Sequence, residues 1–204
     1  MDDLHRRVER SYDAIAHRYA EVIRANRGPD TYFRAFLGHI LERIPEGGRV
    51  LDLGCGAGLV SAELARRARV VALDRSAVQL SLARTNAPDA VLVRGDIAQV
   101  AFRPASFDAV VAFWTLIHVR RDLHGSVLSG IHQWLRPRGV FAATLGTSDS
   151  SEDVEEDFFG APMAWSHFDA DMNRRLVADA GFGVEQADEV FDEGELALWV
   201  IATA

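Results

Sequence analysis

The sequence predicts an α/β fold, in which helices cover both faces of a doubly wound, mostly parallel sheet. From about residue 48 onward, segments with strand character alternate with segments with helix character, which is typical of parallel βαβ units. Most of the strand segments are almost continuously apolar, as strands buried between two helical layers are. The chain has 204 residues, 49 % of them apolar and 25 % charged, a balance that suits one core. We therefore expect residues 1–204 to form a single domain.

Five parallel strands and a C-terminal hairpin give seven strands in all. The five segments are 49–53, 69–73, 90–94, 107–113 and 139–145. Helical patterns between them cover 58–67, 76–86 and 121–135. The last of these helices should end at "LRPRG", where Arg138 occupies a turn position that often holds glycine. Residues 181–204 contain two strand-like runs separated by the acidic, glycine-bearing "DEGE", which predicts an antiparallel hairpin at the sheet edge.

Two regions outside this alternation are expected to cover one end of the sheet. Residues 1–45 hold two predicted helices, 4–25 and 30–44, separated by "NRGPD", and we expect them to form a cap. The connection 146–171 is long, begins polar and acidic and then becomes aromatic, which favours a lid over a binding site. Its acidic cluster, 149–157, is expected to be a solvated helix or loop surface.

Charge and composition narrow the ligand and the location. Thirty acidic against 22 basic residues give a net charge of −8, which would repel a phosphate backbone, so no nucleic-acid partner is expected. No apolar run approaches the roughly 18–20 residues that cross a bilayer, and the first residues lack the apolar middle of a signal peptide. We expect a cytoplasmic chain without a membrane partner. The only cysteine, Cys55, cannot form an internal disulfide or a thiolate metal cluster, and no metal is predicted.

The segment "RVLDLGCGAGLV" carries the most specific signal. Gly54, Gly56 and Gly58 lie between a predicted strand and a predicted helix, where glycine allows a left-handed turn or a close approach to a ligand. A simple tight turn would need one glycine and not three. Dinucleotide-binding loops require a further glycine where this chain has Leu59. Asp52 would be unfavourable beside phosphates but favourable near an ammonium or sulfonium group, so the ligand is expected to be cationic at its reactive end.

These residues resemble motif I of the class I S-adenosylmethionine-dependent methyltransferases, in "VLDLGCGAG". In that family the loop wraps the methionine portion of the cofactor, and the fold is Rossmann-like. "VVALD" resembles the second strand motif, which implies that Asp74 accepts hydrogen bonds from both ribose hydroxyls. "VRGDI" resembles the third, with Asp96 at the adenine amino group and Ile97 on the ring. "SFDAVVAFWTLIHV" and "LRPRGVF" resemble the fourth and fifth, with Phe113 beside the cofactor. Alternatively, Asp74 caps the helix near residue 76 and Asp96 is a turn residue.

The first helix also carries a resemblance. "SYDAIAHRYAEV", residues 11–22, is similar to the N-terminal helix of many small-molecule methyltransferases. Tyr12 and Tyr19 are seven residues apart, two helical turns, so both hydroxyls can face the methionine carboxylate; the alternative is that both rings pack on the sheet. Cys55 suits a small packing residue better than a nucleophile. The expected cofactor contacts are Tyr12, Tyr19, Asp52, Gly54, Cys55, Gly56, Gly58, Asp74, Arg75, Asp96, Ile97 and Phe113.

Two histidines are candidates for a general base. "GAPMAWSHFDAD" resembles a bacterial subgroup with a PMxWSHFD segment, which places His167 in an apolar wall formed by Met163, Trp165 and Phe168. His118 follows the fourth strand, near the expected position of the transferable methyl group. For each histidine the alternative is structural: a lid-locking or helix-capping role for His167 and a packing role for His118.

The function predicted from these features is methylation of a small metabolite, on oxygen or nitrogen, by in-line displacement from S-adenosylmethionine. The aromatic surroundings, Trp114 among them, favour an apolar or aromatic acceptor. A second hypothesis keeps the cofactor site but transfers no methyl, so that the chain is a binding module or catalyses another reaction. A nicotinamide oxidoreductase is disfavoured by Leu59 and Asp52. The sequence leaves a monomer and a homodimer open.

Overall fold

Seven strands form one sheet in the order β3-β2-β1-β4-β5-β9-β8. The computed structural model describes residues 3–26, 28, 31–192 and 194–204. β1 to β5 run parallel to one another, whereas β9 is antiparallel to β5 and β8 is antiparallel to β9. The strands are β1 Arg49–Leu53, β2 Arg69–Asp74, β3 Val91–Arg94, β4 Phe107–Ala112, β5 Leu135–Leu145, β8 Gly183–Asp192 and β9 Glu195–Thr203. The predicted Rossmann-like sheet with its C-terminal hairpin is confirmed; one position of that hairpin's turn, 193, and the first residue of the second predicted helix, 30, lie outside the described residues.

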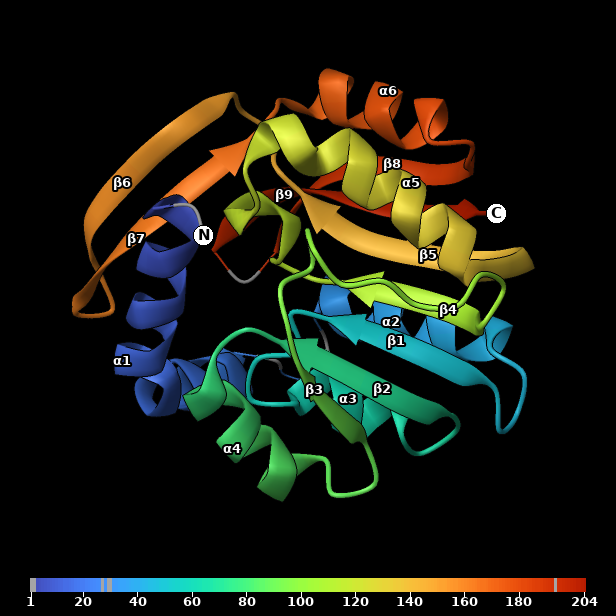
Figure 1. Ribbon diagram of the computed structural model, residues 1–204, viewed down its shortest axis with the longest axis horizontal. Helices are drawn as coiled ribbons and strands as arrows, with labels where there is room; N and C mark the ends of the chain where they lie inside the picture. The colour runs from blue at the N-terminus through green and yellow to red at the C-terminus, as the bar shows by residue number, and fades with distance from the viewer. Residues whose placement is uncertain (1–2, 27, 29–30, 193) are drawn as a thin grey trace.

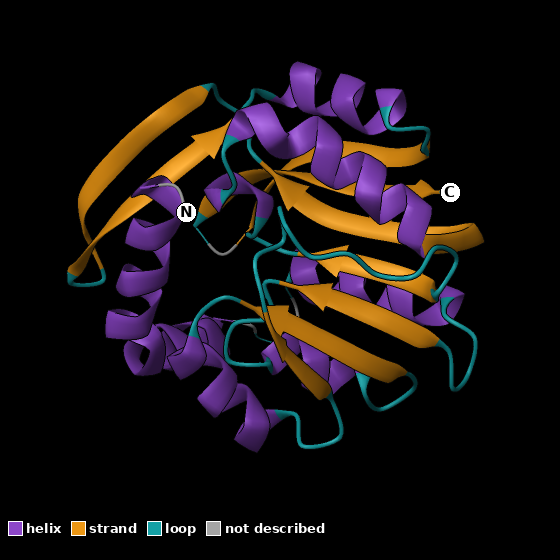
Figure 2. Cartoon of the chain, viewed as in Figure 1, coloured by secondary structure: helices purple, strands orange, loops and turns teal. Residues whose placement is uncertain are grey.

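Helices cover both faces of the sheet (Figures 1 and 2). Alternate side chains of each strand point to opposite faces, so Val50 and Leu51 of β1 belong to different cores. One core includes side chains of α5 and α6, and the other includes side chains of α2 and α3. The helices are α1 Asp3–Asn26, α2 Tyr32–Arg43, α3 Leu59–Leu64, α4 Ala77–Asn86, α5 His124–Trp134 and α6 Ala170–Asp179, with short 3-10 turns η1 Leu116–His118 and η2 Arg121–Leu123.

The strand order reverses between β1 and β4, which are neighbours in the sheet. The chain leaves β1 toward one side and β4 toward the other, so a crevice opens beyond their carboxyl ends. α1 stands across that end of the sheet (Figure 1). Only this first helix of the predicted 1–45 cap does so. α2 instead packs on a face of the sheet through Phe33, Phe36 and Ile40, which bury their side chains in one of the two cores.

The predicted lid over 146–171 is a β-hairpin, which corrects the expectation of an acidic loop or helix. β6 Ser150–Phe158 pairs with β7 Ala161–His167 in a separate two-stranded sheet. Its two turn residues, Phe159 and Gly160, have φ values of 55° and 99°, the left-handed backbone that tight hairpins need. Acidic side chains are poor strand formers, so the exposed run 151–157 carries no local strand signal, and the pairing with β7 decides its conformation.

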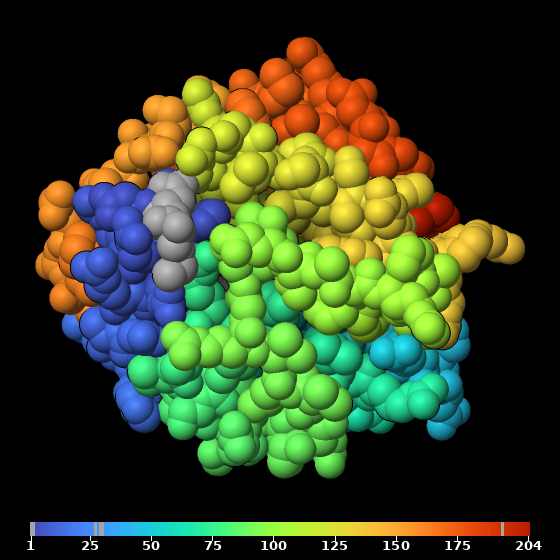
Figure 3. Space-filling view, viewed as in Figure 1, coloured from blue at the N-terminus to red at the C-terminus, as the bar shows by residue number. Residues whose placement is uncertain are grey.

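α1 and the β6–β7 hairpin pack against each other, and we call the two together the roof. Ile15 of α1 belongs to a small apolar cluster with Phe158, Ala161 and Met163 of the hairpin, separate from both sheet cores. In the space-filling view the two elements form one continuous surface at that end of the molecule (Figure 3). Within the described residues, no helix combines the length and the apolar character that crossing a bilayer requires.

Candidate functional site

The three loop glycines all adopt left-handed backbone, for different reasons. A Cβ on Gly54 would lie 2.2 Å from Oγ1 of Thr115, and one on Gly58 would lie 2.9 Å from the backbone of Ala83 in α4. These two glycines therefore allow close packing inside the protein. At Gly56, with φ of 52°, a Cβ would meet no atom closer than 3.8 Å. Gly56 is thus the position where the loop presents bare backbone to open space.

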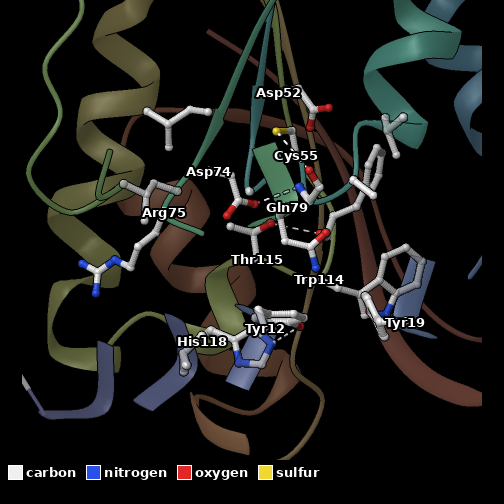
Figure 4. A pocket seen from close by; sticks show the side chains of 18 of the residues that line it. Tyr12, Tyr19, Asp52, Cys55, Asp74, Arg75, Gln79, Trp114, Thr115 and His118 are labelled. Carbon is white, nitrogen blue, oxygen red and sulfur yellow. Dashed lines mark hydrogen bonds between the residues drawn. The ribbon is translucent and has the colours of Figure 1, made fainter. Parts of the chain in front are cut away.

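A cavity of about 170 Å³ lies between this loop and α1. Figure 4 shows its side chains converging from the glycine loop, from the ends of β2 and β4 and from α1. Among the predicted contacts, it is lined by Tyr12, Tyr19, Asp52, Gly54, Cys55, Gly56, Asp74, Arg75, Asp96, Ile97, Phe113 and His118. Gly58 and His167 do not line this cavity. The segments that carry the separate sequence motifs therefore meet at one crevice.

Several lining residues were missed at the sequence level, and some had a readable signal. His5 and Val8 also line the cavity, and they precede Tyr12 on α1 at helical spacing, so the face that carries Tyr12 and Tyr19 also carries them. Gln79 and Thr115 line it as well, and nothing in their local sequence marks them; Trp114, expected beside the acceptor, lines it too.

Asp74 is held at the end of β2 by two backbone donors. The N–H of Gly56 donates to its Oδ2 and the N–H of Ser76 to its Oδ1, both at 2.8 Å. The side chain that caps α4 is Ser76, whose Oγ accepts from the N–H of Gln79 at 3.0 Å. Desolvation by burial raises the pKa of Asp74, against the effect of the backbone donors. Each carboxylate oxygen keeps a lone pair, so Asp74 can still accept hydrogen bonds from a vicinal diol.

Asp52 places a second carboxylate under the glycine loop. Its side chain is buried and accepts a hydrogen bond from Oγ of Ser61 at 2.6 Å. Burial raises the pKa of the Cys55 thiol well above its ordinary value, with further contributions from Asp74 and Asp52. A thiol held neutral is a poor nucleophile, which favours the packing role expected for Cys55. The two carboxylates make this part of the cavity suitable for a cationic ligand group.

Asp96 is fixed in the cavity wall by several partners. Arg75 forms an ion pair with it, the N–H of Ala98 donates to its Oδ1 at 3.0 Å, and the Gln99 amide donates to its Oδ2 at 2.9 Å. Nδ1 of His5 lies 3.6 Å from Oδ2. The carboxylate is therefore positioned by groups from α1 and from the loops after β2 and β3, with Ile97 beside it in the same wall.

Tyr12 and His118 are hydrogen-bonded inside the cavity wall, as the dashed line in Figure 4 marks. His118 Nδ1 contacts the carbonyl oxygen of Ala164 in β7 at 2.9 Å, and because a carbonyl only accepts, Nδ1 carries the proton. His118 Nε2 therefore accepts from the Tyr12 hydroxyl at 2.9 Å. Burial lowers the pKa of His118 to about 4, so the ring is neutral at pH 7 with both nitrogens engaged. The Trp165 ring lies against it, with centroids 4.5 Å apart.

A second cavity, of about 270 Å³, lies beside the first. Among the described residues, Trp114 is the one that lines both. The second cavity is lined by Trp114, Ile117, Thr144, Leu145, Gly146, Thr147, Ser148, Trp165, His167, Glu195, Leu196 and Ala197. His167 Nδ1 donates to the carbonyl oxygen of Ser148 at 2.7 Å, which leaves Nε2 as an acceptor when the ring is neutral.

The predicted apolar wall is therefore only partly correct. Trp165 and His167 line the second cavity, but Met163 is fully buried in the cluster between α1 and the hairpin. Phe168 instead meets the His124 ring edge to face, and the guanidinium of Arg121 lies over the Phe168 ring. In a strand, neighbouring side chains point to opposite sides, so a contiguous run such as 163–168 cannot all face one cavity.

Trp114 separates the two cavities in an unusual backbone conformation. Its φ of 49° is left-handed, which is rare for a bulky residue and typical of functional sites. Its N–H donates to Oγ1 of Thr144 at 2.6 Å, and its ring lies edge to face with Trp199, centroids 5.5 Å apart. Its indole also hydrogen-bonds the carboxylate of Glu195. The backbone of Trp114 is thus tied to β5 and its indole to β9.

A glycine loop after β1, together with acidic residues that end β2 and follow β3 at the same crevice, defines a nucleoside-binding α/β protein. A family model described as a methyltransferase domain matches residues 50–139. An uncharacterized methyltransferase of Synechocystis is 38 % identical over 148 residues, 69 % of each chain. The magnesium-protoporphyrin O-methyltransferase of Rhodobacter capsulatus is 36 % identical over 167 residues, 72 % of each chain. The chain therefore belongs to the S-adenosylmethionine-dependent methyltransferases, and S-adenosylmethionine is its cofactor.

The solved structures agree on the fold. A 1,6-didemethyltoxoflavin-N1-methyltransferase of Burkholderia thailandensis, with that compound and S-adenosylhomocysteine bound, superposes with a TM-score of 0.73. It is 20 % identical, and the match covers all of this chain and 91 % of that one. Among the described residues, no three histidine, cysteine, aspartate or glutamate side chains gather closely enough to hold a metal ion.

Proposed function

We propose that this enzyme methylates a small-molecule acceptor bound in the second cavity, with S-adenosylmethionine in the first. The observation that carries the proposal is the contact of the two cavities at Trp114, where the first is lined by the motif residues and the second by residues from other segments. Methyl transfer from a sulfonium is an in-line displacement, so holding donor and acceptor on either side of one methyl group supplies most of the acceleration.

For the cofactor we assign the following contacts. Asp74 accepts hydrogen bonds from the ribose hydroxyls, and the adenine lies along the wall formed by Asp96 and Ile97. The glycine loop and Asp52 take the methionine portion. Tyr12 and Tyr19, whose rings meet edge to face 5.5 Å apart, close the cavity over that portion. The donors and acceptors of these side chains, and the negative potential from the two carboxylates, suit a nucleoside with a cationic centre.

For the acceptor we assign the general base to His167. When its ring is neutral, its Nε2 can accept a proton from an acceptor hydroxyl, while Nδ1 stays bonded to Ser148. An amine acceptor instead loses a proton before its lone pair attacks. His118 takes a positioning role, because its Nε2 is engaged by Tyr12 and its pKa of about 4 makes it a weak base.

The test is methyl transfer itself. The protein is incubated with methyl-labelled S-adenosylmethionine and a panel of phenols and aryl amines, and S-adenosylhomocysteine and labelled product are followed together. Accumulation of both supports the proposal. Tight binding of the cofactor with no turnover on any acceptor favours the second hypothesis, a cofactor-binding protein that transfers no methyl.

A further inference from the structure

The second cavity contains a carboxylate and, among its described lining residues, no arginine or lysine. Its polar groups are the hydroxyls of Thr144, Thr147 and Ser148, the imidazole of His167 and the carboxylate of Glu195. Glu195 begins β9 at the rim, next to Leu196, which is 51 % exposed. The wall therefore offers a negative group that no arginine or lysine of the wall offsets, and the one other titratable side chain in the described part of the wall is His167.

Arg121 and Arg174, which do not line the cavity, form ion pairs with other carboxylates. Arg121 pairs with Asp149 at 2.8 Å, and Arg174 pairs with Asp171 at 2.9 Å and with Glu189 at 3.1 Å. Within the described part of the chain, Glu195 has no ion-pair partner; the indole of Trp114 hydrogen-bonds it. Desolvation raises the pKa of Glu195, the Trp114 hydrogen bond opposes this, and Glu155 of β6 adds to it. Glu155 of β6 thus adds negative potential at this rim.

Two indoles complete the arrangement. Trp114 and Trp165 both line the cavity, and aromatic faces attract cations as well as apolar groups. A carboxylate with two indoles is a combination that recognises an ammonium group carried on an apolar body. A carboxylate ligand, by contrast, would meet Glu195 without a compensating cation.

We propose that the acceptor is a small apolar molecule that carries a basic amine, and that Glu195 binds the ammonium form of that amine. The inference rests on the proposed function, since it concerns the acceptor cavity of the same enzyme. The apolar walls alone would accept phenols, acids and amines, and the carboxylate of Glu195 narrows this set to molecules with a cationic amine.

The test compares three probes of one shape: 2-phenylethylamine, 2-phenylethanol and 3-phenylpropionate. Each is titrated by NMR against the protein saturated with S-adenosylhomocysteine at pH 7. The amine should bind at least about fivefold more tightly than the alcohol and the acid most weakly, since a partly exposed ion pair with cation–π support is worth about 1 kcal/mol or more.

Glu195→Gln keeps an oxygen acceptor for the Trp114 indole and removes the charge. This variant should lose the preference for the amine and bind the alcohol as before. Glu156→Gln, at an exposed position of β6, removes an equal charge outside the cavity lining and should leave all three affinities unchanged.

Equal binding of amine and alcohol by the unmodified protein, an undiminished preference in Glu195→Gln, or no binding of the amine at millimolar concentration would each overturn the inference. These outcomes are separate from a failure of the proposed function. A preference for the amine without methyl transfer to any acceptor would leave the site assignment intact and refute the enzymatic role. Methyl transfer to a neutral phenol by a protein that shows no preference for the amine would support the proposed function and refute the ammonium site at Glu195.

Discussion

The Tyr12 hydroxyl donates to His118 Nε2 at 2.9 Å, and this contact joins α1 to the 3-10 turn after β4. Since His118 Nδ1 also bonds the carbonyl of Ala164 in β7, one imidazole ties both parts of the roof to the body of the protein. Three elements distant in sequence therefore depend on a single neutral histidine.

Tyr12→Phe should loosen α1. It leaves Nε2 of His118 buried without a donor, which costs about 1–3 kcal/mol. We expect faster amide hydrogen exchange along α1 and weaker binding of S-adenosylhomocysteine, measured by exchange mass spectrometry and calorimetry. Tyr32→Phe is the matched control, since it removes a hydrogen bond from Gln186 at 2.7 Å on α2, outside the cavity lining. Equal exchange on α1 in both variants would contradict the prediction.

Stability should fall as the pH is lowered from about 6.5 toward 4. The pKa of His118 is lowered to about 4 in the folded protein, against an ordinary value of about 6.5, so the unfolded chain binds the extra proton in this window. The histidine therefore contributes a slope of up to about 1.4 kcal/mol per pH unit, and its stabilisation is fully present above pH 6.5.

Urea unfolding across this range measures that slope. His118→Gln should reduce it, and His124, whose pKa is also lowered by burial, should account for part of the remainder. His17→Gln, at an exposed position on α1, serves as control and should retain the full slope. An unchanged slope in His118→Gln would show that the ring is not held neutral by burial.

Substitutions at the loop glycines should separate stability from binding. Gly54→Ala forces a Cβ to within 2.2 Å of Thr115. Overpacking of this kind costs about 1–3 kcal/mol of folding stability, and the strain of a left-handed alanine adds to that cost. Gly56→Ala meets open space and carries the backbone strain of about 1–2 kcal/mol alone. Thermal unfolding and cofactor calorimetry should show the larger loss of stability in Gly54→Ala, and in Gly56→Ala a loss of affinity in a folded protein.

Asp74→Ala should weaken cofactor binding without unfolding the chain. Removing an acceptor of two ribose hydrogen bonds, each worth about 1.5–3 kcal/mol to a charged group, predicts a loss of at least about tenfold in calorimetry. Asp89→Ala, at an exposed position after α4, should bind S-adenosylhomocysteine as the unmodified protein does. Undiminished affinity in Asp74→Ala would refute the ribose assignment.

His167→Gln should reduce turnover on a hydroxyl acceptor by about 10²–10⁴, the usual contribution of a general base, with cofactor affinity unchanged. Glutamine is a polar side chain of similar size and removes the basic nitrogen. Single-turnover measurements with labelled cofactor separate this effect from product release. Full activity of His167→Gln on a phenol would show that His167 is not the general base and that another group or solvent takes the proton.

The sheet could be predicted because its signals are local. β1 has the predicted bounds, 49–53, since an apolar run followed by glycine specifies both strand and end. The meeting of most of the motif residues at one cavity could also be predicted, because those motifs stand at the ends of strands. The β6–β7 hairpin did not, because an acidic strand is stabilised by its partner and not by its own residues. Likewise, the second cavity is assembled from the segments after β4 and β5, from β7 and from the start of β9, whose meeting depends on the tertiary fold.

The apolar cluster that joins α1 to the hairpin lies apart from the two cores that hold the sheet together. α1 also reaches the body of the protein through polar pairs, such as Glu9 with Arg94 at 2.9 Å and Asp13 with Ser76. Substitutions at residues such as Phe158 or Met163 can thus change the shape of the roof, while the strands and loops that form the floor of the first cavity keep their structure. In descendants of this enzyme, acceptor preference can diverge through changes in the roof while the methyl donor stays the same.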